Sequence, residues 1–438
     1  MSMARLPPEL WMLIFKFATH VPHLDDIHPP ESSPYAAAPD DVSLDDLRAS
    51  LHFRASVARV SQRFHALAAA TIPYNCVLVT NDNSHSLRQL IVNYNPSSAS
   101  GGRRGKPIHP LLRAVRHLVL EITDEETFHG RKSLRKNLLT IIYNLPSILS
   151  FTSAPASPPA NLVSAYRALL CTSKRLRKLV FQDPKSVGRH ISSIERLLAA
   201  SPNLETLVFR AGDCIKFPYT IDVSKPMPHL VHLNIEEPSF SLNVPPDSPP
   251  TFWLPSLRRV RVHVSAAQVQ PWTKYGAHLT HLSLTLDHHV SRSFVLFTDG
   301  CCPNLTHLAL HCRPLTMSNI LLQPLPPTLR RVSLSMYTIP NIDGADDFWT
   351  ISMPVLHGIV DRVTVLRGRC PQLESVRFKN DEMVRSIQTM ARKRGLDLKR
   401  LSRLPIRIEG RNGKLFMDRL IEAQATLYHF ESSRTRIP

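Results

Sequence analysis

The sequence predicts an α/β protein in which short parallel strands and helices alternate many times, after a small N-terminal helical module. Three observations support this. A six-residue apolar pattern recurs at nearly constant spacing, the segments between its copies have helical periodicity, and residues before about 76 differ in composition from the rest.

The recurring pattern is an apolar residue, two residues of any type, an apolar residue, one of any type, and an apolar residue. Its copies begin at residues 115, 176, 204, 230, 257, 279, 305, 329 and 373, with a degenerate copy at 148. Most intervals lie within the roughly 20–29 residues typical of leucine-rich repeats. Since one repeat cannot bury its apolar face alone, stacked repeats build the core together. The sequence therefore predicts a curved leucine-rich-repeat solenoid with a parallel sheet on its concave side.

The segments between the copies are expected to be helices. Ile194, Leu197 and Leu198 share one helical face, and Pro202 then stops the helix and turns the chain into the next strand. Cys302 and Cys370 precede a proline at the same place in their repeats. We expect these two thiols to be small apolar plugs at helix ends.

Strand alternation assigns a face to each residue of a copy. The last two apolar residues of each copy are expected in the core, as at Leu207, Phe209, Leu282, Leu284, Leu308 and Leu310. The residues beside them are expected on the concave surface. In the later copies these are rich in bases and contain no acid: Arg259, Arg261, His263, His281, His307, His311, Arg331, Arg377 and Lys379.

This basic set predicts a binding site for an acidic or phosphorylated protein substrate, because guanidinium groups pair with carboxylate and phosphate. The histidines are expected to add affinity as the pH falls through about 6.5, the ordinary pKa of imidazole. The alternative is a uniformly basic surface without a specific ligand.

Three parts are predicted along the chain. Residues 1–76 form the helical module, with an exposed Pro- and Asp-rich insertion at about 22–46. Residues 77–385 form the repeat solenoid. The basic segment 386–438 is expected to cap its open end, as repeat arrays require.

The N-terminal module opens with Leu6-Pro7-Pro8-Glu9-Leu10, and Leu6, Leu10, Ile14 and Phe15 are expected to share a helical stripe. A later segment contains Val60-Ser61, Phe64 and Leu67. This arrangement resembles the F-box, a three-helix module with an L-P-x-E-L/I opening and a later V-C/S-x-x-W-x-x-L helix. Phe64 stands where that family usually has Trp. An F-box followed by leucine-rich repeats is a known family architecture.

The resemblance implies that the module binds a Skp-type adaptor of a cullin complex. The adaptor-binding residues it implies are Leu6, Pro7, Glu9, Leu10, Ile14, Phe15, Val60, Phe64 and Leu67. The alternative is that residues 5–76 are a helical cap on the solenoid, since amphipathic stripes usually belong to a core.

The composition limits the classes of partner and the cellular compartment that can be expected. With 53 Lys and Arg against 35 Asp and Glu, the net charge of +18 favours acidic partners, whether nucleic acid or protein. Seven cysteines without a C-x-x-C pair indicate a reducing compartment. Neither a signal peptide nor a run of roughly 18 apolar residues is present, so we expect a soluble protein of the cytoplasm or nucleus, without membrane contact.

No motif for catalysis, a cofactor or a nucleotide is found. The region richest in His and Cys includes His307 and His311, but on a strand these two lie about 13 Å apart, so no metal site is expected. The predicted function is therefore that of a non-enzymatic substrate receptor of an SCF-type cullin ubiquitin ligase. The alternatives are a repeat scaffold without ligase coupling, and a basic nucleic-acid-binding solenoid, which the lack of aromatic residues among the bases disfavours.

Overall fold

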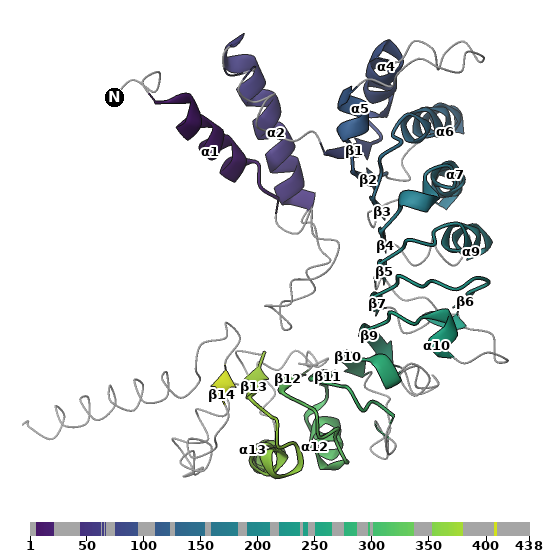
Figure 1. Cartoon of the computed structure of the whole chain (residues 1–438). Coiled ribbons are helices and arrows are strands. Elements are labelled where there is room, and N and C mark those ends of the chain that lie inside the picture. The colour runs from purple at the N-terminus through teal and green to yellow at the C-terminus, as the bar shows by residue number, and fades with distance from the viewer. Residues whose placement is uncertain are drawn as a thin grey trace, which may run out of the picture. The chain divides into compact units, whose positions relative to one another are not determined.

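The structure is a computed structural model of the chain. It describes residues 6–21, 44–62, 64, 66, 75–94, 110–122, 128–153, 159–182, 191–210, 219–236, 240–243, 250–264, 276–286, 297, 301–336, 353–379 and 407–409. The chain divides into two compact units, which are unit 1 (Met1–Pro255) and unit 2 (Ser256–Pro438). The division falls inside the predicted repeat array, at the end of its Pro-rich stretch 245–255. Both units are mixed α/β (Figure 1).

Unit 1 contains parallel strands that follow one another in chain order. They are β1 (Cys76–Thr80), β2 (His117–Glu121), β3 (Ser150–Ser153), β4 (Lys178–Phe181), β5 (Thr206–Phe209) and β7 (His232–Ile235). The register aligns equivalent positions of successive repeats, as Leu179 with Leu207. A separate parallel pair joins β6 (Tyr219–Asp222) to β8 (Phe240–Asn243).

The helices of unit 1 supply the crossovers that parallel strands need. They are α4 (Ser84–Tyr94), α5 (Pro110–Ala114), α6 (Phe128–Tyr143), α7 (Pro159–Leu169), the 3-10 turn η3 (Ser173–Arg175), α9 (Ile191–Ala199) and α10 (Pro250–Trp253). Helix α6 packs between α4 and α7, and α7 packs on α9, so these helices form a row beside the strands (Figure 1). Ile194, Leu197 and Leu198 are the buried residues of α9, as the sequence predicts.

The six-residue pattern marks the strands in both units. Each copy of the pattern has a strand that begins two residues after its first apolar position. The backbone pairing starts one residue earlier, because the second residue of a copy accepts hydrogen bonds from the next copy. The Arg177 carbonyl, for example, accepts the N–H groups of Glu205 at 2.8 Å and Thr206 at 2.9 Å. The degenerate copy at 148 is confirmed as a strand, β3, and the Leu149 carbonyl accepts the Arg177 N–H at 2.8 Å.

Unit 2 repeats this architecture with longer strands. They are β9 (Arg259–Val264), β10 (His281–Leu286), β11 (His307–Cys312), β12 (Arg331–Met336), β13 (Ser375–Phe378) and β14 (Arg407–Glu409). Its helical elements are η4 (Gly276–His278), α12 (Pro314–Leu322) and α13 (Met353–Arg369), and α12 packs on both β11 and α13. Strand β14 belongs to the predicted capping segment and extends the sheet beyond the last copy of the pattern.

Two helices precede the strands of unit 1. Helix α1 (Pro8–Ala18) begins after Pro7, with Glu9 in its first turn, where the helix dipole favours an acid. Helix α2 (Leu44–Val60) fixes the end of α1, because Ser50 Oγ donates to the Thr19 carbonyl at 2.9 Å. The same helix packs Leu47 against Leu78 of β1 and Val119 of β2. Helix α2 therefore shares a core with the first strands, while α1 packs on α2 through a separate cluster around Phe15 and Val57.

The core contains the residues that strand alternation places there. Leu207, Phe209, Leu282, Leu284, Leu308 and Leu310 are each at most 1% exposed, so this prediction is confirmed. Cys302 and Cys370 are buried as predicted. Gly276 is required in this core, because a Cβ there would meet the Cys301 carbonyl oxygen at 1.7 Å.

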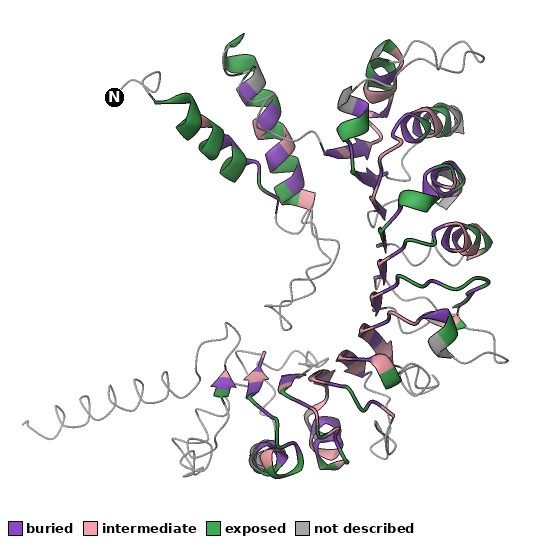
Figure 2. Cartoon of the chain, in the orientation of Figure 1, coloured by how far each residue is buried: buried purple, intermediate pink, exposed green. Residues whose placement is uncertain are grey.

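The two units differ on the sheet face that carries the residues between these core positions, which we call the distal face. In unit 1 its residues are buried as well, including Val119, Val180, Thr206, Val208 and Asn234. In unit 2, strands β9, β10 and β11 alternate strictly between buried and half-exposed residues (Figure 2). Among the described strands, β9, β10 and β11 thus present a half-exposed face along their whole length.

Candidate functional site

The bases predicted on the concave surface come together on the distal face of unit 2. Parallel pairing places them in rows across neighbouring strands, which lie about 4.8 Å apart. One row contains Arg259, His281, His307 and Arg331. A second row contains Arg261 of β9, then Ser283, Ala309 and Ser333, and Arg377 of β13.

His263 and His311 belong to a third row, in which both are paired with Thr285 of β10. Lys379 follows the end of β13 and donates its backbone N–H to the Leu334 carbonyl at 2.8 Å. Its ammonium group lies close enough to His311 to lower the pKa of that ring. The predicted bases therefore form one surface, which we call the basic face.

The imidazoles of His281 and His307 are stacked at the centre of the first row. Their ring centroids are 4.1 Å apart and their planes differ by 6°. A threonine hydroxyl precedes each ring in the chain: Thr280 Oγ1 lies 2.9 Å from His281 Nδ1, and Thr306 Oγ1 lies 2.8 Å from His307 Nδ1. Two imidazolium charges at about 4 Å would repel by about 4 kcal/mol at an effective dielectric constant of about 20. The pair therefore accepts one proton much more readily than two.

Burial, together with the neighbouring cations, keeps His307 and His311 neutral. Burial, and then the charges of Arg331, Arg259 and Arg330, lower the pKa of His307 to about 4. Burial, with Arg261 and Lys379 behind it, lowers the pKa of His311 to about 4. The expectation that these two rings gain charge near pH 6.5 is therefore wrong for the ligand-free protein, because sequence gives the ordinary pKa and not the burial.

Burial is also the main cause that lowers the pKa of Lys379 to about 8, with Arg261 and Arg377 next in order. An ammonium group taken out of water beside two guanidinium groups is less stable in its charged form. Any anion that binds at this end of the face would reverse that effect. The crowding of like charge thus makes the basic face a site that gains stability when a negative charge arrives.

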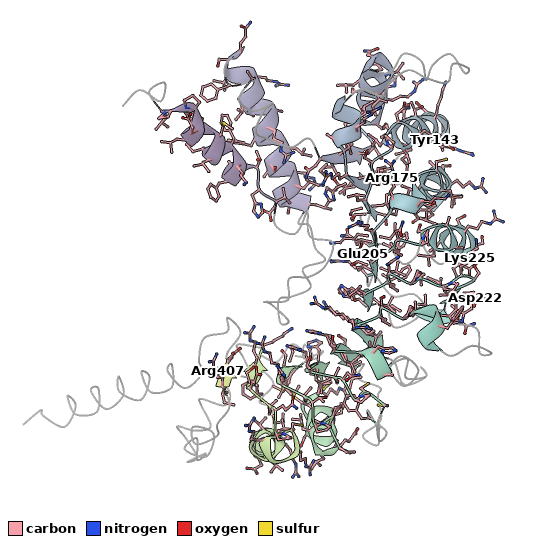
Figure 3. All side chains as sticks on the ribbon, in the orientation of Figure 1. Tyr143, Arg175, Glu205, Asp222, Lys225 and Arg407 are labelled. Atoms are coloured by element: carbon pink, nitrogen blue, oxygen red, sulfur yellow. The ribbon has the colours of Figure 1, made fainter. Side chains whose placement is uncertain are left out.

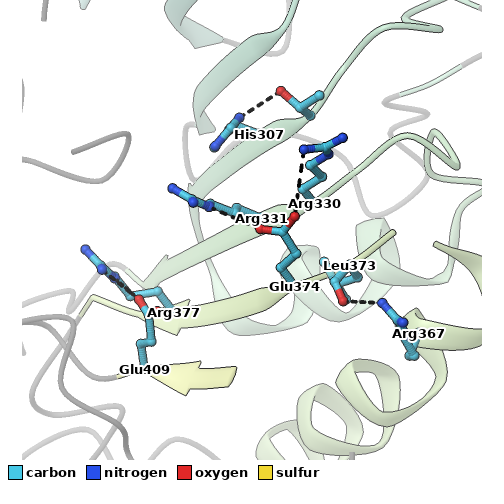
Figure 4. A network of polar contacts seen from close by, with 9 residues as sticks. His307, Arg330, Arg331, Arg367, Leu373, Glu374, Arg377 and Glu409 are labelled. Carbon is cyan, nitrogen blue, oxygen red and sulfur yellow. Dashed lines mark hydrogen bonds and ion pairs between the residues drawn. The ribbon is translucent and has the colours of Figure 1, made fainter. Parts of the chain in front are cut away.

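Two carboxylates already neutralise part of the basic face (Figure 4). Glu409 of β14 accepts two hydrogen bonds from Arg377, from Nε at 2.8 Å and from Nη2 at 2.6 Å. Glu374 lies 3.8 Å from Arg330 and 3.9 Å from Arg331, which is too long for direct hydrogen bonds. Arg377 is therefore held by two hydrogen bonds to one oxygen of Glu409, Oε2, whereas the counter-charge beside Arg331 is more distant and partly exposed.

Neither carboxylate was expected from the sequence. Glu374 lies one residue before β13, where the repeat pattern assigns no ligand contact. Glu409 lies in the predicted cap, and only the pairing of β14 with β13 brings it beside Arg377. Its short strand, RIE, has no repeat signal of its own.

A second candidate surface is the apolar side of α1. Of the predicted stripe, Leu6, Leu10 and Ile14 are exposed, at 37%, 44% and 41%. Phe15 is not part of it: its side chain is 1% exposed and packs with Val57, Trp11 and Phe64. The helix therefore has two apolar faces, one in the core and one in water.

Sequence reasoning missed two residues of the exposed face. Leu13 and Phe17 are 50% and 78% exposed, and together with Leu10 and Ile14 they have the spacing of one helical stripe. That spacing was visible in the sequence. The prediction included Phe15 instead, because it assumed a single apolar stripe, whereas α1 has two. Figure 2 shows that most of α1 is exposed.

The other residues implied by the F-box resemblance lie at several places. Pro7 and Glu9 are exposed at the start of α1, and Val60 is 66% exposed at the end of α2. Phe64 is half-buried, with its ring 4.8 Å from Trp11 in an edge-to-face contact. Leu67 lies outside the described residues.

Unit 1 carries a separate depression of about 380 Å³ at the edge where its strands begin. It is lined by Leu149, Lys174, Arg175, Arg177, Asn203, Glu205 and His229. Figure 3 labels Arg175 and Glu205 there. Arg175 donates to the Pro146 carbonyl at 3.0 Å, and Arg177 lies 3.4 Å from Glu205. Arg175, Arg177 and Glu205 are thus engaged by neighbouring groups, and we assign the depression no ligand.

Within the described ranges, no group of three or more His, Cys, Asp or Glu side chains is arranged to hold a metal ion. No helix in the same ranges is long and apolar enough to cross a membrane. No protein-family model matches this sequence, and no curated protein matches it.

Proposed function

We propose that this protein is a substrate-receptor subunit of an SCF-type cullin ubiquitin ligase. In this role the N-terminal helices bind a Skp-type adaptor, and a leucine-rich-repeat solenoid holds an acidic or phosphorylated protein substrate. The observation that carries the proposal is the exposed apolar stripe of α1, which starts from the Leu6-Pro7-Pro8-Glu9-Leu10 opening that resembles the F-box.

The α1 stripe is suited to a partner because the opposite face already anchors the helix. Trp11 and Phe15 pack toward Phe53 and Phe64, and the Thr19 carbonyl accepts hydrogen bonds from Ser50 and Arg54 of α2. Covering the exposed face is therefore not needed to fix the helix. Burying one large apolar side chain is worth about 1.5–3 kcal/mol, so Leu10, Leu13, Ile14 and Phe17 together favour association.

The role requires no catalytic residue of this chain. A receptor acts by raising the effective concentration of its substrate near the enzyme that transfers ubiquitin, as linked binding sites do. The basic face of unit 2 supports the substrate end of this proposal, since guanidinium groups bind carboxylates and phosphates in fixed geometry.

Adaptor binding is the first test. Replacing Leu10 and Ile14 by Ala is expected to weaken the affinity for a purified Skp-type adaptor at least tenfold, since truncating a buried interface anchor typically costs about 2 kcal/mol or more. Isothermal titration calorimetry measures the change. The matched control is Leu90→Ala with Val365→Ala, two residues on other helices whose exposures, 48% and 47%, resemble that of Leu10.

The same titration separates the proposal from its alternatives. Full-strength adaptor binding by the Leu10 and Ile14 variant, or no binding by the natural chain, would exclude the receptor role. A repeat scaffold without ligase coupling would then remain. A nucleic-acid binder would instead show affinity for DNA or RNA that falls steeply with salt.

A further inference from the structure

The stacked histidine pair lies at the centre of the first row of the basic face, and its rings can change charge with their Nδ1 hydrogen bonds intact. Each Nδ1 faces a threonine hydroxyl, which can donate to a neutral ring or accept from a charged one. When it accepts, its own hydrogen needs another acceptor. Thr306 Oγ1 lies 3.0 Å from the Thr280 carbonyl, and Thr280 Oγ1 lies 3.2 Å from the Arg258 carbonyl. Both protonation states are therefore satisfied at Nδ1.

The surroundings of the pair decide which state is populated. His281 and His307 stack face to face, with Arg259 on the strand beside one and Arg331 on the strand beside the other. Arg330 adds a third cation, and the acid Glu374, one residue before the neighbouring strand β13, lies about 4 Å from Arg330 and Arg331. Burial and the predominance of positive charge among these side chains both disfavour a proton on His307 until a negative charge arrives.

We propose that the row Arg259–His281–His307–Arg331 is a site for the phosphate group of a phosphorylated protein side chain, and that it binds this group together with one proton taken up by the histidine pair. The inference rests on the proposed function, because it specifies the substrate chemistry of the basic face. The two arginines supply the permanent charge from the strands on either side of the pair. The proton supplies the remaining positive charge only when the anion is present.

The coupling follows from thermodynamic linkage. An opposite charge within hydrogen-bonding distance raises the pKa of an imidazole, which for His307 starts at about 4. Any ligand that raises a pKa binds more tightly as the pH falls. Because the rings stack at 4.1 Å, the second proton is opposed by the first, and the pair takes up at most one proton.

Sulfate is the sharpest probe of this coupling. It has the shape and double charge of a phosphate group but carries no proton between pH 5 and 8, so any proton taken up on binding must go to the protein. We expect the sulfate affinity of the full chain to rise as the pH falls from about 8 to about 5, by up to about tenfold per pH unit. Calorimetry in buffers of different ionisation enthalpy measures the protons taken up, with an expected value between zero and one.

Variants of the site test whether the proton is taken up by the His281–His307 pair. His307→Gln keeps a polar side chain that cannot titrate, so sulfate is expected to bind with much less proton uptake. Thr306→Val removes the acceptor that a charged His307 needs and is expected to reduce the uptake in the same direction. Arg331→Gln is expected to weaken binding at every pH. His229→Gln, an exposed histidine of unit 1, is the control and should leave the uptake unchanged.

Three results would overturn the inference: no sulfate binding, binding without proton uptake, or uptake that persists in both His307→Gln and Thr306→Val. Circular dichroism of each variant checks that the fold is kept. The outcome is independent of the adaptor titration. Proton-coupled sulfate binding with no adaptor affinity would keep the site and exclude the receptor role, whereas adaptor binding without the coupling would keep the role and exclude the site.

Discussion

The distal faces of the two units are built from the same repeat pattern and have opposite character. In β4 and β5 of unit 1 the middle position of the strand is apolar and buried, at Val180 and Val208. In unit 2 the equivalent positions of β10 and β11 are Ser283 and Ala309, which are half-exposed between rows of bases. A repeat therefore fixes which residues share a face, while the outward residues decide whether that face joins a core or meets a ligand.

The largest effect is expected when an aspartate is introduced at the same strand position in each unit, which tests whether the two distal faces differ. Val208→Asp would bury an unpaired carboxylate in β5 and is expected to lower the free energy of unfolding by more than about 4 kcal/mol. Ala309→Asp, at the same place in β11, is expected to change it by less than about 1 kcal/mol. Chemical denaturation measures both variants. Equal losses would mean that the distal faces do not differ.

The core on the opposite face of the strands, which contains Leu207 and Leu308, should show no such difference between the units. Leu207→Ala in β5 and Leu308→Ala in β11 remove side chains that are both at most 1% exposed, and each is expected to cost about 2–5 kcal/mol. Because repeats share interfaces with their neighbours, hydrogen exchange should increase in the adjacent strands too. A loss below about 1 kcal/mol in either variant would contradict the burial of that strand.

The smallest expected effect is a pH dependence confined to unit 2. The pKa values of His307 and His311 are about 4 in the fold and about 6.5 in the unfolded chain, so the unfolded state binds protons first. The stability of this region is therefore full above about pH 6.5 and is lost as the pH falls toward about 4. Each shift corresponds to about 3 kcal/mol, which solvent screening of these partly exposed rings reduces to about 1–2 kcal/mol.

Hydrogen exchange resolved by strand checks this, since protection of β10–β12 should fall more steeply between pH 7 and 5 than protection of β4 and β5. His307→Gln combined with His311→Gln should flatten the slope in unit 2. An unchanged slope in this double variant would show that other groups control the acid response.

Much of the fold could be predicted from the sequence. The spacing of the apolar pattern predicted the parallel strands, their order and the core residues Leu207 to Leu310, and strand alternation placed the later bases on one face. Helical spacing on α1 predicted that Leu10 and Ile14 share a stripe. These features depend on local periodicity, which the order of residues contains directly.

Only the tertiary structure decided the rest. It placed Phe15 in the core and left Phe17 in water, because α2 covers one side of α1 and not the other. It brought Glu409 beside Arg377 through a strand without a repeat signal, and stacked His281 on His307. It also lowered the pKa of His307 and His311. Burial and charge at one residue depend on segments distant in the chain, so periodicity predicts which residues share a face but not what covers or neutralises them.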